Sequence, residues 1–313
     1  MHVLELERVT KLFGDFRAVD ELDFSVGEGT ITGFLGPNGA GKTTTIRMIL
    51  GILKPTSGRI SVFGAPSAME VRERIGYLPE EKGLYKKMKC WAILAYFASL
   101  KGMDRRSAKR RAFELLERYG LKDFAEKRTE ALSKGMGQKV QVLSAIAHDP
   151  DLAILDEPFS GLDPVNQQVL EEVIRDLAAR GKTVLFSTHV MQHAERLCDR
   201  ILLLARGGKL FDGTVPEALA SIPRRVRIET DDDLRPLRAL RDVVAIEPWQ
   251  KDGDAAARGA FELELAEQAD PQVILRTCFE TGIRLRRFDH ADPTLHEVFV
   301  KLVGHEAREA SFR

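Results

Sequence analysis

Short apolar runs recur along the first two thirds of the chain, at residues 31–35, 152–155, 183–186 and 201–204. Runs of this length are typical of strands buried within a sheet. The first three are followed by turn residues and then by helical sequence. Strands that interleave with helices predict an α/β core with a largely parallel sheet.

Further elements are expected around these runs. Additional strands are predicted near residues 3–6, at 22–26 and at 209–213, and helical periodicity is present at 43–50 and within 88–119. The basic run at 105–111 falls mostly off the apolar face of its helix. A solvated helix face explains it better than a contact with lipid or nucleic acid.

The pattern changes near residues 221–223. Beyond them we expect strands at 226–230, 243–248, 261–265 and 283–288, and helices at 234–241 and 271–281. The order β-α-β-β-α-β would suit a small ferredoxin-like α+β domain. We therefore expect two domains, residues 1–222 and residues 223–313.

The composition excludes several classes of protein. The 47 Lys and Arg balance 47 Asp and Glu, which argues against a nucleic-acid coat. Cys90, Cys198 and Cys278 are odd in number and far apart, so neither a disulfide framework nor a zinc site is expected. The N-terminus has no signal-peptide core, and the longest apolar stretch, 91–100, is shorter than the roughly 20 residues of a membrane span. These features predict a soluble, cytoplasmic chain.

A phosphate-binding loop is expected between the first buried strand and the helix that follows it. The pattern G-x-x-x-x-G-K-[ST] is met by Gly36, Pro37, Asn38, Gly39, Ala40, Gly41, Lys42 and Thr43, with Thr44 next. Glycines let backbone N–H groups form an anion nest at the N-terminus of the helix. Lys42 would then lie between the β- and γ-phosphates, and the Thr43 hydroxyl would ligate Mg²⁺.

Two adjacent acids, Asp156 and Glu157, end the strand at 152–155. Neighbouring side chains of a strand point to opposite faces, so the two should have different roles. Asp156 is expected in the Mg²⁺ shell, and Glu157 is free to orient or deprotonate an attacking water. Acids after a strand are often only loop or cap residues. Because the chain also has Lys42 and Thr43 in a phosphate-loop motif, we favour roles for Asp156 and Glu157 in metal binding and catalysis.

Further motifs resemble those of ABC transporter ATPases. Residues 132–138, Leu-Ser-Lys-Gly-Met-Gly-Gln, are similar to the LSGGQ signature. Residues 160–163 resemble the D-loop, 187–189 the switch-histidine segment, 76–80 the Q-loop, and Phe13 with Gly14 the adenine-stacking segment. Because the motifs follow in the family's order, the chain is identified as a member of the ABC ATPases.

The resemblance implies a P-loop NTPase core with a helical subdomain at about 86–150. It also implies a head-to-tail dimer that sandwiches ATP between the Lys42 loop of one subunit and Ser133 to Gly135 of the other. Asp163 would join this composite site, and His189 would hold the γ-phosphate and the attacking water. Phe13 would stack on adenine; core packing is the alternative for its side chain.

The sequence departs from the family's commonest pattern at three positions. Glu80 stands where glutamine is usual: its carboxylate can meet Mg²⁺ but lacks the amide donor. Lys134 replaces a signature glycine, and either attracts phosphate or faces solvent. Met136 replaces the usual glutamine. These departures therefore concern catalytic rate and coupling rather than nucleotide binding.

The segments at 75–85 and 132–136 look like the exporter branch that includes sodium-efflux and drug-resistance ATPases. The resemblance implies an ATPase that powers export through a membrane-spanning permease on a separate chain. It would act as a homodimer or heterodimer on the inner face of the cell membrane. Two alternatives are a soluble ABC protein acting on ribosomes or DNA and a nucleotide-gated regulatory module with weak hydrolysis. The single phosphate loop and the lack of long heptads argue against the first.

Overall fold

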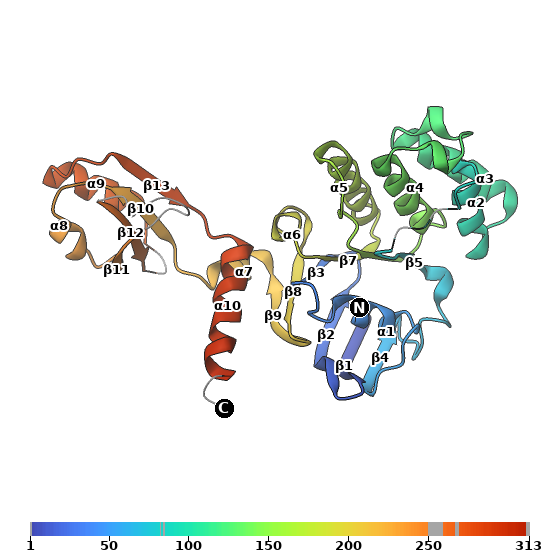
Figure 1. The fold of residues 1–313 in the computed structure, drawn as a ribbon, viewed down its shortest axis with the longest axis horizontal. Coiled ribbons are helices and arrows are strands. Elements are labelled where there is room, and N and C mark those ends of the chain that lie inside the picture. Colours follow the sequence, from blue (N-terminus) through green and yellow to red (C-terminus); the bar gives the residue numbers. More distant parts are fainter. Residues whose placement is uncertain (1, 82, 84, 250–258, 267–268, 311–313) are drawn as a thin grey trace. The chain divides into compact units, whose positions relative to one another are not determined.

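The structure is a computed structural model of the chain, and it describes residues 2–81, 83, 85–249, 259–266 and 269–310. The chain forms two compact units, Met1–Val215 and Pro216–Arg313 (Figure 1). The division falls a little before residue 222, because helix α7 (Val215–Ala220) lies almost wholly in the second unit. Within the described residues, no helix combines the length and the apolar content that a membrane span requires.

A six-stranded sheet forms the centre of the first unit. Its order is β5-β6-β7-β3-β8-β9, and neighbours are parallel except for β8 and β9. The bounds are β3 (Ile31–Leu35), β5 (Ile75–Leu78), β6 (Leu152–Asp156), β7 (Thr183–Thr188), β8 (Arg200–Ala205) and β9 (Gly208–Thr214). Strands β3, β6 and β7 are buried throughout, as expected for parallel strands covered on both faces. The predicted α/β core with a largely parallel sheet is confirmed.

Side chains of this sheet alternate between two hydrophobic cores. Ala153 and Leu155 of β6 belong to one core, and Leu152 and Ile154 belong to the other. The second core is closed by helix α1 (Lys42–Ile49) and by the antiparallel sheet β2-β1-β4. That sheet consists of β1 (His2–Phe13), β2 (Phe16–Gly27) and β4 (Ser57–Val62). The alternation puts Asp156 on the same face of the sheet as α1.

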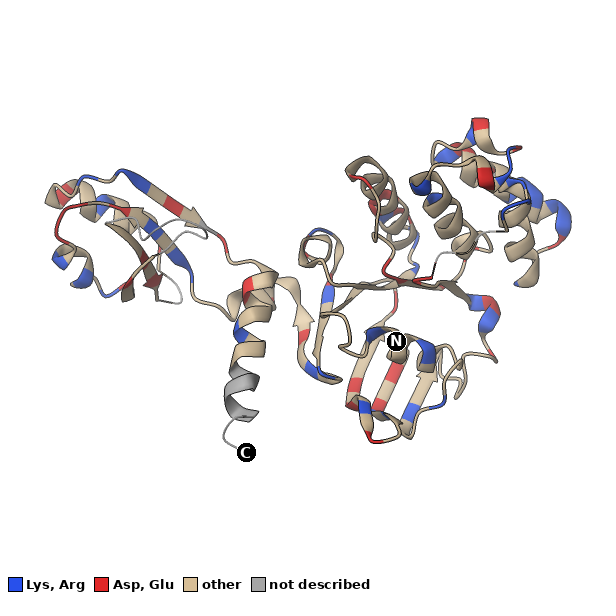
Figure 2. Ribbon diagram, viewed as in Figure 1, with Lys and Arg blue, Asp and Glu red and all other residues tan. Residues whose placement is uncertain are grey.

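Three helices, α2 (Cys90–Leu100), α3 (Arg105–Arg118) and α4 (Lys134–Ile146), pack together in what we call the helical arm. The expected helical stretch at 88–119 is two helices, because the Asp104 carboxylate caps a new one by accepting the N–H groups of Arg106 and Ser107. Basic side chains recur along α3 (Figure 2). Five of them are exposed, which agrees with a solvated helix face: Arg105, Arg106, Lys109, Arg110 and Arg118.

Helices α5 (Pro164–Ala179) and α6 (Met191–Leu197) of the first unit both pack against β7. Asp163 caps α5 by accepting the N–H of Asn166, and Pro164 occupies the first helical turn. The other elements are the short 3-10 helices Arg72–Arg74, Lys122–Phe124 and Thr129–Ala131.

The second unit contains a four-stranded antiparallel sheet in the order β11-β12-β10-β13. Its elements follow in the order β-α-β-β-α-β, which is that of the ferredoxin-like fold. They are β10 (Arg225–Glu229), α8 (Arg235–Arg238), β11 (Val243–Pro248), β12 (Ala260–Leu265), α9 (Gln272–Thr281) and β13 (Arg287–Ala291), with α10 (Leu295–Ala310) after them. Val226, Ile228 and Leu263 lie in the core of this unit.

The last strand of this sheet begins later than the sequence predicts. We expected a strand at 283–288, but β13 starts at Arg287. Residue 283 instead completes the end of α9: the N–H of Ile283 donates to Cys278 O at 2.9 Å, and Gly282 has a left-handed φ of 75°. This is a Schellman motif, in which the apolar residue after the glycine is buried. The apolar Ile283 therefore marks the end of a helix. The alternation of apolar and basic residues at 283–286 resembles a strand, and this explains the wrong prediction.

We predict that Gly282→Ala destabilises the second unit by about 1 kcal/mol, because a Cβ is disfavoured at a left-handed φ. Gly304→Ala is the matched control: its added methyl group in α10 has nothing within 4 Å and should leave stability unchanged or raise it. Urea unfolding is followed by Trp249 fluorescence in a Trp91→Phe background, since these are the chain's 2 tryptophans. Equal unfolding midpoints for both variants would contradict the motif.

Candidate functional site

The loop between β3 and α1 forms one wall of a cavity of about 270 Å³. Its predicted residues Pro37 to Thr44 all line this cavity. Gly36 is not among the lining residues, but its carbonyl oxygen accepts a hydrogen bond from Lys42. Gly41 has a φ of 96°, and a Cβ there would lie 2.6 Å from Ala18 O. Only glycine therefore allows the loop to lie this close to β2.

Lys42 is the buried cation of this loop. Its ammonium group donates to Gly36 O at 2.6 Å and to Pro37 O at 3.2 Å, and it lies 3.5 Å from Glu157 Oε1. Both charged side chains are less than a tenth exposed. Weak screening in such a site strengthens the attraction of Lys42 for any anion in the cavity.

Asp156 lies on the same side of the sheet as Thr43. Its Oδ1 accepts a hydrogen bond of 2.5 Å from Ser187 Oγ. Burial raises the pKa of Asp156, and the hydroxyls of Ser187 and Thr43 only partly counter this effect. Among the described residues, Oδ2 finds no hydrogen bond of good geometry. A buried carboxylate oxygen without a partner, beside a threonine hydroxyl, fits a divalent cation such as Mg²⁺.

Glu157 turns away from Asp156 toward the loop and β7. Its φ of 48° is in the left-handed region, where a non-glycine residue is strained. The backbone N–H donates to Ser187 Oγ at 2.9 Å, and Oε2 lies 3.0 Å from His189 Nδ1. An ionised Glu157 requires Nδ1 to carry the proton. The geometry thus joins Lys42, Glu157 and His189 in one chain of polar contacts.

The rest of the cavity wall brings in Glu80 and an aromatic ring. Glu80 lines the cavity beside the phosphate loop, as its predicted role in a metal shell requires. Phe16 and Ala18 of β2 also line it. Phe13 does not belong to this lining, and its ring lies 5.1 Å from the Lys11 ammonium group instead. Phe16 is therefore the aromatic side chain that the structure brings to the cavity.

The signature residues lie on a separate surface formed by α4 and α5. Ser133 caps α4 by accepting the Met136 N–H at 3.3 Å. A Cβ on Gly135 would lie 2.3 Å from Asn166 Nδ2, and this amide donates to Asp163 Oδ2 at 2.5 Å. Ser133, Gly135 and Asp163 are not among the described residues that line the phosphate-loop cavity.

The sequence analysis assigned no role to three residues of this arrangement. Ser187 joins Asp156 to the backbone of Glu157, Phe16 lines the cavity, and Asn166 lies between Gly135 and Asp163. Ser187 and Asn166 both lie within three residues of a predicted site residue. The signal for Phe16 was a second aromatic residue on the other side of the Gly14-Asp15 turn.

Comparison with known proteins assigns the chain to a family. It matches the family model described as ABC transporter over residues 19–160, and the model described as ATP-binding protein DrrA1-3-like, C-terminal domain, over residues 222–303. It is 43% identical over 303 residues to the uncharacterized ABC transporter ATP-binding protein YhaQ of Bacillus subtilis (strain 168), covering 96% of this chain and 99% of that protein. The chain belongs to the ABC transporter ATP-binding proteins.

Other similarities of this ATP-binding protein agree with the assignment. It is 35% identical over 310 residues to the Nod factor export ATP-binding protein I of Burkholderia orbicola (strain AU 1054), covering 98% of each chain. A solved structure described as the ATP binding subunit of an ABC transporter matches 70% of this chain and 92% of its own, with a TM-score of 0.64 and 32% identity. The predicted family and its fold are confirmed, and the exporter branch is supported.

We predict that Phe16→Ala weakens ATP binding more than Phe13→Ala does. Loss of a base–aromatic stack costs about 1–3 kcal/mol, whereas Phe13 lies outside the cavity lining. Titration calorimetry with ATP measures both dissociation constants, and ADP serves as a second ligand with the same base. A larger loss with Phe13→Ala would show that Phe13 is the adenine platform.

Proposed function

We propose that this ATP-binding protein hydrolyses ATP to power export through a permease on a separate chain. The observation that carries the proposal is the contact of Glu157 with both Lys42 and His189 at the edge of the phosphate-loop cavity. Lys42 and Glu157, which line the cavity, would supply a cation for phosphate and a carboxylate for water, and His189 would orient that carboxylate. The likeness to a Nod factor export protein supports the direction of transport.

The contacts of Glu157 suggest how nucleotide would prepare the site. Phosphate oxygens that enter the loop compete with Glu157 for the Lys42 ammonium group. Oε1 would then be free to accept a proton from water, while His189 holds Oε2. Thr43, Asp156 and Glu80 would hold Mg²⁺, which neutralises the developing charge on the phosphates.

The signature would complete the site of a second subunit. Ser133 and Gly135 lie outside the cavity of their own subunit but at the N-terminus of α4, and such a helix end attracts phosphate. This chain carries a full set of motifs, namely Lys42, Ser133, Asp156, Glu157 and His189. A second copy of it could therefore form both composite sites.

An exposed aromatic cluster formed by Tyr85 and α2 would be the surface on which the permease docks. Tyr85 packs against Tyr96 with ring centroids 6.0 Å apart, and Tyr96 packs against Phe97 at 5.6 Å. Tyr85, Tyr96 and Leu100 are all exposed, and the cluster lies soon after Glu80 in the sequence. A permease that docks here would bring this protein to the inner face of the cell membrane and sense movement of the Glu80 segment.

We predict that Glu157→Gln binds ATP but loses nearly all turnover and accumulates an ATP-bound dimer. The amide keeps the shape of the side chain but cannot accept a proton from water. Phosphate release with Mg²⁺ present measures turnover, and gel filtration with ATP detects the dimer. If Glu157→Gln hydrolyses ATP in the steady state at the rate of the parent protein, the assignment of Glu157 as the base is wrong.

We also predict that the tagged chain recovers a protein with several membrane spans from solubilised membranes of its source, and that Tyr96→Ala reduces the recovery. Phe279→Ala is the matched control, because Phe279 is 90% exposed on α9 of the second unit. Mass spectrometry identifies and quantifies the partner. Recovery of ribosomes or DNA in place of a membrane protein would overturn the transport proposal.

A further inference from the structure

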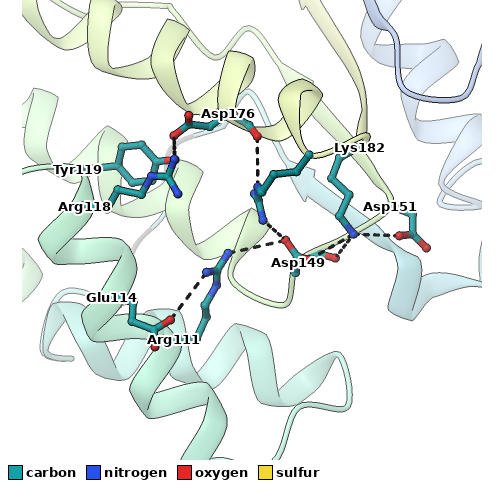
Figure 3. A network of polar contacts seen from close by, with 9 residues as sticks. Arg111, Glu114, Arg118, Tyr119, Asp149, Asp151, Asp176 and Lys182 are labelled. Atoms are coloured by element: carbon teal, nitrogen blue, oxygen red, sulfur yellow. Dashed lines mark hydrogen bonds and ion pairs between the residues drawn. The ribbon is translucent and has the colours of Figure 1, made fainter.

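A network of ion pairs joins the helical arm to the sheet at the edge opposite the phosphate loop (Figure 3). Because β3, β5, β6 and β7 are parallel, Asp156 and the phosphate loop lie at the carboxyl ends of these strands. The network lies at their amino ends, where Asp151 precedes β6 and Lys182 precedes β7. It therefore has no direct part in binding phosphate.

Asp149 is the centre of this network and lies just beyond the end of α4. Its N–H donates to Ile146 O, and its φ is 59°. A carboxylate near the C-terminus of a helix opposes the helix dipole, so it needs cations nearby. Three converge on it: Arg180 just after α5 at 2.5 Å, Lys182 at 3.3 Å and Arg111 of α3 at 3.7 Å. Although burial acts to raise it, Arg180 and Lys182 hold the pKa of Asp149 below its usual value.

A second contact holds the other end of the same face of α3. Asp176 of α5 accepts from Arg118 at 2.6 Å and from the Tyr119 hydroxyl at 2.8 Å. Burial and this hydrogen bond raise the pKa of Tyr119 to about 12, so the phenol stays a donor. Arg111 and Arg118 are seven residues apart and share one face of the helix. Helix α3 is thus held against the core at two points.

A third contact extends the network to β5. Asp151 lies 3.1 Å from Lys182 and 2.7 Å from Arg74. Arg74 directly precedes β5, the strand that leads toward Glu80. The network consequently joins the arm, α5 and the starts of three parallel strands.

We propose that this network sets the direction of α4 and so positions the Ser133 signature for a partner subunit, with Asp149 as the positioning residue. The proposal rests on the composite site of the proposed function. Helix α4 has 13 residues, so its fixed end lies about 20 Å from the signature. A small change of angle at Asp149 is magnified at Ser133 by this length.

The strength of the ion pairs favours positioning over stability. The side chains of Asp149 and Asp176 are 42% and 32% exposed, and ion pairs at such exposure contribute little to stability. The arm is held to the core mainly by the continuous apolar cluster that includes Leu116, Leu143 and Leu155. Apolar contacts are not directional, whereas the ion pairs fix which cation meets which carboxylate.

The test uses Asp149→Asn, because asparagine tolerates the left-handed φ and keeps the size of the side chain but loses its charge. Asp212→Asn is the matched control: Asp212 of β9 also pairs with two cations, Arg200 at 3.0 Å and Lys209 at 3.5 Å, but these belong to β8 and β9 and not to the arm. Spin labels at Lys134→Cys and Glu28→Cys, both exposed positions, report the distance between the signature and the core.

We expect Asp149→Asn to shift or broaden this distance distribution and Asp212→Asn to leave it unchanged. In the Glu157→Gln background, Asp149→Asn should weaken ATP-dependent dimerisation roughly threefold to thirtyfold, while the affinity of the monomer for ATP stays the same. In the active chain, kcat should fall and KM should not. Arg118→Glu should act similarly, and Asp176→Lys added to it should restore dimerisation.

Each opposite result has a distinct meaning. An unchanged label distance in Asp149→Asn, or dimerisation equal to that of the control, overturns the positioning role. An equal loss of ATP affinity in the monomer also overturns it, because it indicates general damage to the fold. If Glu157→Gln alone forms no dimer, the composite-site proposal fails, and the label distance still decides whether the network sets the direction of α4.

Discussion

The phosphate-loop site depends on the contacts of the Lys42 ammonium group. In a place that is almost closed to water, it is held by two carbonyl groups of the loop and by the Glu157 carboxylate. A buried charge of this kind is stable only when it is paired. Under the proposed function, an anion that enters the loop would replace Glu157 at the ammonium group, so phosphate entry would release this carboxylate for catalysis.

The two ends of the strands in the parallel sheet carry different groups of residues: one group surrounds the phosphate loop, and the other holds the helical arm. Residues at the carboxyl ends of its strands, such as Asp156 and His189, converge on the phosphate loop, as is general for open α/β sheets. Residues at the amino ends, such as Asp149 and Asp151, join the arm to the core by ion pairs. Asp151 directly precedes β6 and Asp156 is its last residue, so one short strand connects the ion pairs of the arm with the carboxylate beside the phosphate loop.

Local spacing made most of the site predictable, and long-range pairing explains what was missed. The phosphate loop, and Asp156 with Glu157, could each be predicted from a buried strand followed by a short, fixed order of residue types. Within each motif the side chains are close in sequence, so the local backbone is enough to position them. Phe16 faces the cavity only through the register of β1 and β2, and Ser187 acts through the pairing of β6 with β7. The start of β13 was misplaced because a buried isoleucine after Gly282 satisfies a helix end as well as a strand.

The central claim is that each catalytic site combines the phosphate loop of one subunit with the signature of another. Mixing two inactive variants of the full chain, Lys42→Ala and Ser133→Arg, tests it most directly. A mixed dimer contains one site with an intact loop and an intact signature, so the account predicts hydrolysis well above the sum of the separate proteins. Activity that stays at that sum would contradict a site formed between subunits.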